Sequence, residues 1–320
     1  MREWVVKEEN IEYKISLGRL TYLKGNKNEW ESVIKSILSY FNNKKTMTII
    51  SQDNQMLKPK DYQIVFLKQE AILEVDDTSN NYLNSKKDDF INEVMLSPMY
   101  RDFLESWEML QEEVEFLSKQ KKILSQDKFN LLPFDKKDLT KKLNWEITNS
   151  DFSNEDKKLE LINLYAKELF NKQVLFFIEM PEKTIISEVG IKKFQLHVEK
   201  MLTRGINVFI ISEHIWMDGA INHFYFSDIV NELQIMVKKE QIIAKIPLIV
   251  EESDWIKAIN WSMLAVDNYG GKTVELKLEA VDNLVVFVLV YFIFIYNGWR
   301  IIVDYKGIPA NIIVYLDRLI

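Results

Sequence analysis

Apolar and polar residues alternate along the first part of the chain, a pattern typical of half-buried β-strands. Residues 3–7 and 11–17 keep this period of two on either side of the polar turn Glu8-Glu9-Asn10, which predicts an antiparallel hairpin. From Trp30 to Phe41 apolar residues recur every three or four positions, which predicts a helix starting near Glu29. Further strands are expected at 20–23, 46–51 and 62–67.

From about residue 86 the spacing becomes helical. Ser97 suits an N-cap and Pro98 the first helical position, where its missing N–H costs nothing. The apolar residues that follow have the alternating spacing of a coiled-coil seam: Phe103, Trp107, Leu110, Val114, Leu117 and Leu124. An ordinary amphipathic helix on a core has the same spacing, so both interpretations stay open. Another helix is expected over 155–171, with Ser153 and Asp156 in capping-box spacing.

A βαβ unit is predicted in the middle of the chain. The continuous apolar run 174–178 is followed by a helix to about Thr203, by Gly205 as a helix stop and by a second apolar run over 206–211. Strands that are apolar at consecutive positions are typical of a parallel sheet covered by helices on both faces. We therefore expect an α/β fold with a mostly parallel sheet.

The chain after residue 235 reads as an additional lobe. Its pattern predicts a strand at 243–250, a helix at 255–266 and a strand at 273–278. The apolar segment Leu284 to Tyr296 fits either a buried helix ended by Gly298 or one arm of a hairpin turning on Asn297-Gly298. We accordingly expect three parts: an α/β head (1–85 and 146–235), an inserted helical arm (86–145) and a C-terminal α/β lobe (236–320).

Composition excludes several kinds of site. The 320 residues include no cysteine, which rules out disulfides, zinc-thiolate sites and a cysteine nucleophile, and only three histidines, which disfavours a histidine metal site. The N-terminus turns acidic within ten residues, unlike a secretory signal, and the 13 residues from Leu284 to Tyr296 fall short of the roughly 20 that span a membrane. A cytoplasmic protein without membrane contact is expected.

Residues 20–41 place a strand, a glycine loop and a helix where a phosphate-binding loop would lie. Gly25 and Ser32 match the ends of the motif G-x-x-x-x-G-K-S/T. Trp30, however, stands at the second glycine and Glu31 at the lysine. A carboxylate there would repel phosphate, so the motif is degenerate and nucleotide hydrolysis is disfavoured.

Other residues lie at the ends of the apolar strands, the edge of a parallel sheet where ligands bind. Glu179 ends one run and has the place of the acidic residue of a nucleotide-binding site, but a surface glutamate before Pro181 explains it equally well. Ser212-Glu213-His214 follows the next run, and a lone histidine there is more often structural.

Charge is unevenly distributed along the chain. The overall net charge is −7, yet residues 70–115 carry 13 acidic and three basic side chains, whereas residues 119–142 carry three aspartates and eight lysines. The eight are Lys119, Lys121, Lys122, Lys128, Lys136, Lys137, Lys141 and Lys142. Lysines contact phosphates without reading bases, so this lysine cluster is a candidate DNA-binding surface, assisted by Lys24 and Lys27; a solvated helical surface is the simpler interpretation.

Taken together, these segments resemble a known family. The degenerate loop after Gly18-Arg19-Leu20-Thr21-Tyr22-Leu23-Lys24, the inserted arm, and the strands of residues 173–179 and 208–213 resemble the long subtype of the Csn-type accessory protein of type II-A CRISPR systems. The similarity lies in element order over about residues 1–235.

This resemblance implies a non-enzymatic protein of CRISPR spacer acquisition. It implies a homotetrameric ring that binds double-stranded DNA ends and works with the adaptation integrase and the type II effector nuclease. Shorter family members hold Ca²⁺ through acidic residues after the long helix, where this chain has its lysines, so no calcium ligands are carried over. No cofactor is expected, and Ca²⁺ stays open only as what the resemblance implies. The alternatives are a P-loop-type ATPase related to structural-maintenance proteins, or a protein-interaction scaffold that does not contact DNA.

Overall fold

The computed structural model divides the chain into two compact units, Met1–Ala71 with Ser153–Ile320, and Ile72–Phe152. The second unit contains the predicted arm, while the predicted head and C-terminal lobe both fall in the first; the boundary between those two stays a prediction. The structure describes residues 2–8, 11–25, 27–42, 47–53, 55–72, 81–120, 129–143, 152–167, 170–226, 228–269 and 272–318.

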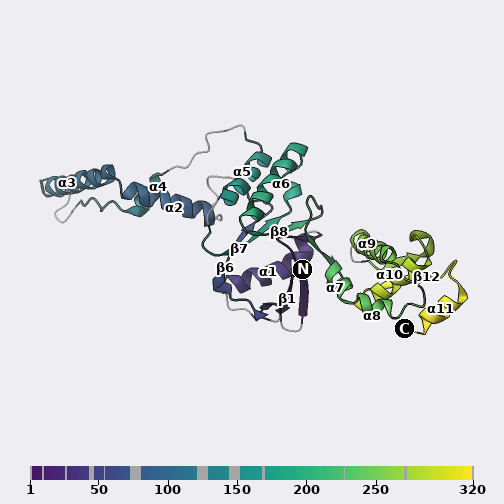
Figure 1. Ribbon diagram of the computed structural model, residues 1–320. Helices are drawn as coiled ribbons and strands as arrows, with labels where there is room; N and C mark the ends of the chain where they lie inside the picture. The colour runs from purple at the N-terminus through teal and green to yellow at the C-terminus, as the bar shows by residue number, and fades with distance from the viewer. Residues whose placement is uncertain are drawn as a thin grey trace. The chain divides into compact units, whose positions relative to one another are not determined.

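A six-stranded, largely parallel sheet forms the centre of the first unit, which confirms the mixed α/β class (Figure 1). Its order is β10-β9-β3-β8-β7-β6, and only β10 runs antiparallel to its neighbour. The strands are β3 (Leu20–Lys24), β6 (Tyr62–Leu67), β7 (Gln173–Glu179), β8 (Asn207–Ser212), β9 (Ala220–Tyr225) and β10 (Asp228–Val230).

Both faces of this sheet are covered, as the continuous apolar runs predict. On one face Phe176 meets Tyr165 of α5 (Asn154–Lys167), with ring centroids 5.1 Å apart. On the other face Phe177 stacks on Phe209 at 4.5 Å, and Trp4 stacks on the same Phe209 at 5.3 Å. Helix α6 (Glu188–Thr203) connects β7 and β8, so the predicted βαβ unit is confirmed, and Gly205 follows it with a φ of 80° that favours glycine.

A second, antiparallel sheet packs against α1 (Lys27–Phe41). It has the order β2-β1-β4-β5 and contains the predicted hairpin, whose last pair is Glu8 with Ile11. Its strands are β1 (Arg2–Glu8), β2 (Ile11–Leu17), β4 (Ile49–Gln52) and β5 (Gln55–Met56), and η1 (Pro59–Asp61) leads on to β6.

The second unit is helical, with α2 (Asn81–Met95), α3 (Pro98–Gln120) and α4 (Lys136–Lys142). Ser97 caps α3, since its hydroxyl accepts the N–H of Tyr100, as predicted. The seam of α3 is used in part: Phe134 contacts the rings of Trp107 and Phe103, and the Trp107 indole donates to the carbonyl of Leu132. The side chains at seven-residue spacing on the same helix stay about two-fifths exposed: Phe103 (39%), Leu110 (42%) and Leu117 (42%).

The C-terminal elements form a separate apolar cluster around α10 (Leu284–Asn297). This decides between the two interpretations of the segment: it is a buried helix, capped by Asn283 at its start and ended by Gly298 at a φ of 69°. The predicted strand at 243–250 is wrong, because α8 ends at Ile243 and no strand follows before α9; Ile242 and Ile246 are buried against the cluster from a helix and a turn. The remaining elements are α7 (Glu232–Val237), α8 (Lys239–Ile243), α9 (Glu252–Tyr269), β11 (Val274–Lys277), η3 (Leu278–Ala280), β12 (Ile301–Asp304) and α11 (Ala310–Asp317).

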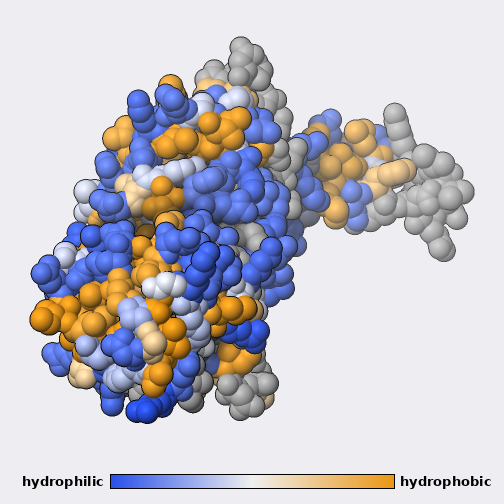
Figure 2. Space-filling model, turned by 90° about the vertical axis from the view of Figure 1, so that its right-hand side faces the viewer, coloured by the Kyte–Doolittle hydropathy of each residue, from blue (hydrophilic) through white to orange (hydrophobic). Residues whose placement is uncertain are grey.

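Apolar side chains also reach the surface of these C-terminal elements, as the orange areas in the lower part of Figure 2 show. They include Ile249, Ile256, Leu264, Ile302 and Val314, each more than half exposed. Among the described residues no helix is long and apolar enough to cross a membrane.

Candidate functional site

The loop between β3 and α1 is too tight to cradle phosphates. Helix α1 already begins at Lys27, two residues after Gly25, so the positions of the predicted motif up to Ser32 lie inside the helix. The Gly25 N–H, which a phosphate-binding loop would turn to its ligand, donates to the carbonyl of Ser212 at 3.1 Å. Gly25 has a φ of 132°, which favours glycine, and a Cβ there would collide with the carboxylate of Glu29.

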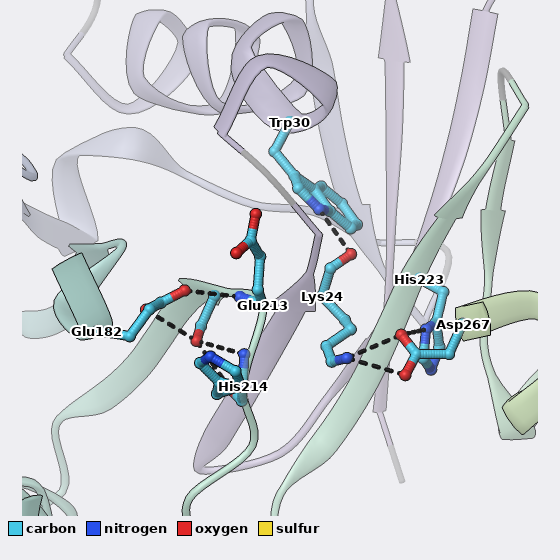
Figure 3. Close-up of polar contacts among 8 residues, drawn as sticks. Lys24, Trp30, Glu182, Glu213, His214, His223 and Asp267 are labelled. Atoms are coloured by element: carbon cyan, nitrogen blue, oxygen red, sulfur yellow. Dashed lines mark hydrogen bonds and ion pairs between the residues drawn. The ribbon is translucent and has the colours of Figure 1, made fainter. Parts of the chain in front are cut away.

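Trp30 closes this loop from the inside. Its indole is fully buried, and Nε1 donates to the carbonyl of Lys24 at 3.1 Å (Figure 3). Glu31, at the position of the motif lysine, is exposed and pairs with Lys35 at 2.6 Å. The pKa of Glu31 is lowered by this hydrogen bond, so the carboxylate remains anionic. Neither the backbone nor the charge here suits a nucleotide phosphate.

Lys24 points away from the loop and towards α9. Its Nζ lies 2.8 and 2.9 Å from the two carboxylate oxygens of Asp267, and the Nδ1 of His223 lies 3.5 Å from one of them (Figure 3). The hydrogen bond with His223, followed by that with Lys24, lowers the pKa of Asp267 to about 2 against the opposing effect of burial. Lys24, a predicted DNA contact, therefore already has an anionic partner within the chain.

Lys27 belongs to a second charged group, beside the ends of β6 and β7. Its Nζ lies 3.2 Å from Glu70, and this hydrogen bond raises the pKa of Lys27. Glu179, at the end of β7, accepts the backbone N–H of Gln69 at 2.9 Å. This contact holds the chain where it leaves β6, so the structure gives Glu179 a positioning role within the sheet edge.

Lys158 of α5 is fully buried behind the same segment. Its Nζ donates to the carbonyls of Lys68 at 2.6 Å and Gln69 at 3.2 Å. Burial lowers the pKa of Lys158 to about 8, although Glu179 and Glu70 partly offset it. A lysine of this kind fixes the segment after β6 by hydrogen bonds while remaining sensitive to alkaline pH.

We expect the free energy of unfolding to rise between about pH 8 and 10.5 relative to that of a Lys158→Met variant, by up to about 3 kcal/mol. The folded chain releases the ammonium proton of Lys158 near pH 8, whereas the unfolded chain keeps it to about pH 10.5. Between these pH values unfolding takes up a proton, so unfolding becomes less favourable as the pH rises. Urea denaturation at several pH values measures the difference. Lys157→Met, at the partly exposed neighbouring position, controls for residue type. A pH-independent difference between the wild type and Lys158→Met would contradict the assignment.

The segment after β8 is held by contacts within the sheet edge. The carboxylate of Glu182 accepts the N–H of Glu213 at 2.8 Å and lies 3.0 Å from the Ser212 hydroxyl (Figure 3). The same hydroxyl accepts the N–H of His214 at 2.9 Å. These bonds explain Ser212 and Glu213 structurally, while the His214 side chain is exposed.

The lysine cluster lies in the helical unit, and five of its eight members are described; Lys121, Lys122 and Lys128 lie outside the described residues. Lys119 pairs with Glu115 at 3.5 Å, and Lys136 lies 3.6 Å from Asp88 and 2.9 Å from the Asn92 amide oxygen. The other three are exposed and pair with no carboxylate of the described part of the chain: Lys137, Lys141 and Lys142. All three belong to α4, which Asp135 caps by accepting the N–H groups of residues 137 and 138.

Several residues of these sites were not expected from the sequence. His223 becomes a neighbour of Lys24 only through the parallel pairing of β3 and β9, and Asp267 comes from a helix 243 residues further along the chain. Lys158 had a detectable signal, because it shares the helical spacing of the buried Leu161, Ile162 and Tyr165. Within the described residues, no group of three or more metal-binding side chains comes together.

Comparison with known proteins informs the fold alone. No protein-family model matches the chain, and no curated protein matches it significantly. The crystal structure of Stu0660 of Streptococcus thermophilus is similar over 98% of this chain and 98% of its own, with a TM-score of 0.53 and 14% identity. The two chains therefore share an overall fold.

Two proteins of ABC transporters are more distantly similar. One is cbiO1 from Clostridium perfringens, part of the ABC transporter complex cbiONQ, with a TM-score of 0.32 and 13% identity over 76% of this chain and 93% of that one. The other is MJ1267 in its ADP conformation, an ATP-binding cassette of an ABC transporter, with a TM-score of 0.32 and 12% identity over 72% and 89%. At this TM-score neither similarity establishes a shared fold.

Proposed function

We propose that this chain is a non-catalytic protein that binds double-stranded DNA ends and acts as a ring-forming accessory scaffold in CRISPR spacer acquisition. The observation that carries the DNA-binding part is a set of exposed lysines on α4 that pair with no carboxylate among the described residues: Lys137, Lys141 and Lys142, called here the α4 lysines. Three neighbouring ammonium groups without counter-ions in the described part of the chain attract a polyanion by releasing its condensed counterions. Lysine gives this attraction without base specificity, which suits a protein that accepts any sequence.

The absence of a catalytic role is supported by the loop between β3 and α1. In this degenerate P-loop the indole of Trp30 fills the interior, the Gly25 N–H is already bonded, and Glu31 brings a negative charge. A P-loop ATPase needs free backbone N–H groups and a lysine at these positions. The ATPase alternative therefore requires a phosphate site that this loop does not supply.

Self-association is supported by apolar side chains of α3 that stay partly exposed. Phe103, Leu110 and Leu117 recur every seven residues and stay about two-fifths exposed after Trp107 has packed within the unit. A row of apolar side chains at this period is buried when two helices pack side by side. A homotetramer would place several sets of α4 lysines around one DNA duplex, and the adaptation integrase and effector nuclease would be its protein partners.

The proposal predicts end-dependent, salt-sensitive binding. Native mass measurement of the full chain, alone and with a linear duplex, reports subunit number and DNA occupancy together. We expect an assembly of four subunits that retains linear duplex, and a dissociation constant that rises about tenfold or more between 50 and 200 mM salt, in line with several phosphate contacts. A closed circular duplex of the same sequence and length is the matched control.

Each other outcome overturns part of the proposal. Equal binding of the linear and circular forms would remove end recognition. No binding of either form would leave the protein-interaction scaffold, which the exposed apolar side chains of α3 also favour. Turnover of ATP by the purified chain would restore the ATPase alternative.

A further inference from the structure

Lys24, His223 and Asp267 form a small charged cluster at the ends of two neighbouring strands, called here the Asp267 cluster. The parallel register of β3 and β9 pairs Lys24 with His223, so both side chains start from adjacent points of one sheet edge. Asp267 approaches them from α9, and its carboxylate binds Lys24 through both oxygens at 2.8 and 2.9 Å. Figure 3 shows the carboxylate between the lysine ammonium and the imidazole.

The carboxylate in this cluster has the surroundings that a phosphate group requires. An ammonium donates to its two oxygens and an imidazole Nδ1 lies 3.5 Å from one of them. An ammonium group holds a phosphate through the same charge-assisted hydrogen bonds. Asp267 remains anionic at ordinary pH, since these neighbours lower its pKa to about 2. Asp267 is thus an anion, supplied by the chain itself, between an ammonium group and an imidazole ring.

The exposure of the three side chains shows which one covers the others. The side chain of Asp267 is 33% exposed, whereas those of Lys24 and His223 are only 13% and 9% exposed. The cluster lies at the carboxyl ends of β3 and its neighbours, the edge at which sheets of this class bind ligands. An external anion reaches Lys24 and His223 only when Asp267 moves aside.

We infer that Lys24 and His223 form a phosphate-binding site that the carboxylate of Asp267 occupies, so that phosphate binding and the contact between Asp267 of α9 and Lys24 exclude each other. By linkage, phosphate weakens the contact of α9 by the same factor by which that contact weakens phosphate binding. Where the phosphate belongs to a DNA end, the site rests on the proposed function and extends it. A free phosphate ion offers the same chemistry.

Three variants of the full chain test the site with inorganic phosphate, measured by isothermal titration calorimetry. Asp267→Asn removes the internal anion and keeps the shape of the side chain, so we expect phosphate affinity about tenfold above wild type. Asp267→Asn combined with Lys24→Gln should lose that gain. Asp267→Glu keeps the anion and should bind as weakly as wild type. Equal affinity of Asp267→Asn and wild type, or of the single and double variants, would overturn the inference.

Hydrogen exchange of the wild-type chain gives a test that does not depend on how the variants fold. Saturating inorganic phosphate should speed the exchange of the amides in the last turn of α9, around Asp267, because it displaces that side chain from Lys24. Unchanged exchange there at saturation contradicts the site. Duplexes with and without a 5′-phosphate distinguish the source of the anion. If inorganic phosphate binds as expected and no duplex binds any variant, the phosphate site stands and the proposed DNA function fails. If duplex binds the wild type while inorganic phosphate binds Asp267→Asn no better than the wild type, the proposed function stands and the inference fails.

Discussion

Replacing the α4 lysines Lys137, Lys141 and Lys142 by glutamate is expected to lower the affinity for linear duplex DNA by at least about a hundredfold near physiological salt. If each lysine neutralises one phosphate, the loss of three contacts also reduces the slope of log Kd against log salt by about 2.7. The substituted side chains are exposed, so the variant should fold as the wild type does. Fluorescence anisotropy with a labelled duplex at four salt concentrations gives both quantities.

A matched control variant distinguishes an effect of where the lysines lie from an effect of the net charge of the chain. Lys192, Lys193 and Lys200 are exposed on α6, and their replacement by glutamate changes the net charge of the chain by the same amount. The control should retain most of the wild-type affinity. If it loses as much as the α4 variant, binding depends on overall charge, and α4 is not the interface.

Replacing Trp30 by alanine is expected to lower the free energy of unfolding by about 3–5 kcal/mol, the usual cost of removing a large buried aromatic side chain. Trp30 is fully buried, its ring lies 5.6 Å from that of Phe224, and its indole N–H bonds the carbonyl of Lys24. Urea denaturation measures the change. The result tests whether the indole holds the loop between β3 and α1 closed.

Trp30→Phe is the informative partner variant. It keeps most of the buried apolar area and removes the hydrogen bond to Lys24, and a lost hydrogen bond of this kind costs roughly 1 kcal/mol on top of the smaller volume. The alanine variant should therefore be clearly less stable than the phenylalanine variant. A loss below about 1 kcal/mol for Trp30→Ala, or binding of labelled ATP by the wild type, would show that the loop is not closed by Trp30.

The sequence was most informative where each residue depends on its local neighbours. The hairpin of β1 and β2, the cap at Ser97, the βαβ unit of β7 and β8, and the stop at Gly205 were all predicted correctly. In each case the deciding feature is a hydrophobic period, a capping side chain or a glycine, and it fixes the structure of residues only a few positions away in the sequence. The degenerate character of the loop after Gly25 was also visible, because Trp30 and Glu31 replace the residues that phosphate needs.

The sequence was least informative where an apolar run has more than one way to become buried. The residues from Ile243 to Val250 suit a strand, but a helix and a turn bury Ile242 and Ile246 against α10 instead. The segment 284–296 has no polar face, so its periodicity left helix and hairpin open, and only its place inside a shell of other elements made it a helix. In the same way, the seam of α3 was visible, but its division between Trp107, which packs, and Leu110, which stays exposed, depends on where residues 129–134 lie.

The α/β class, the parallel sheet and the loss of the phosphate-binding residues could all be inferred from the sequence, since they follow from side-chain types at fixed local spacing. Which of the described lysines have a carboxylate partner depends instead on tertiary packing. Lys24 and Lys27 looked equivalent to the α4 lysines as charges along the chain, yet Asp267 and Glu70 approach them, whereas Lys137 pairs with no carboxylate of the described ranges. The reason is physical: an ion pair depends on the distance between two groups in space, and residues 24 and 267 become neighbours only when the sheet and α9 pack together.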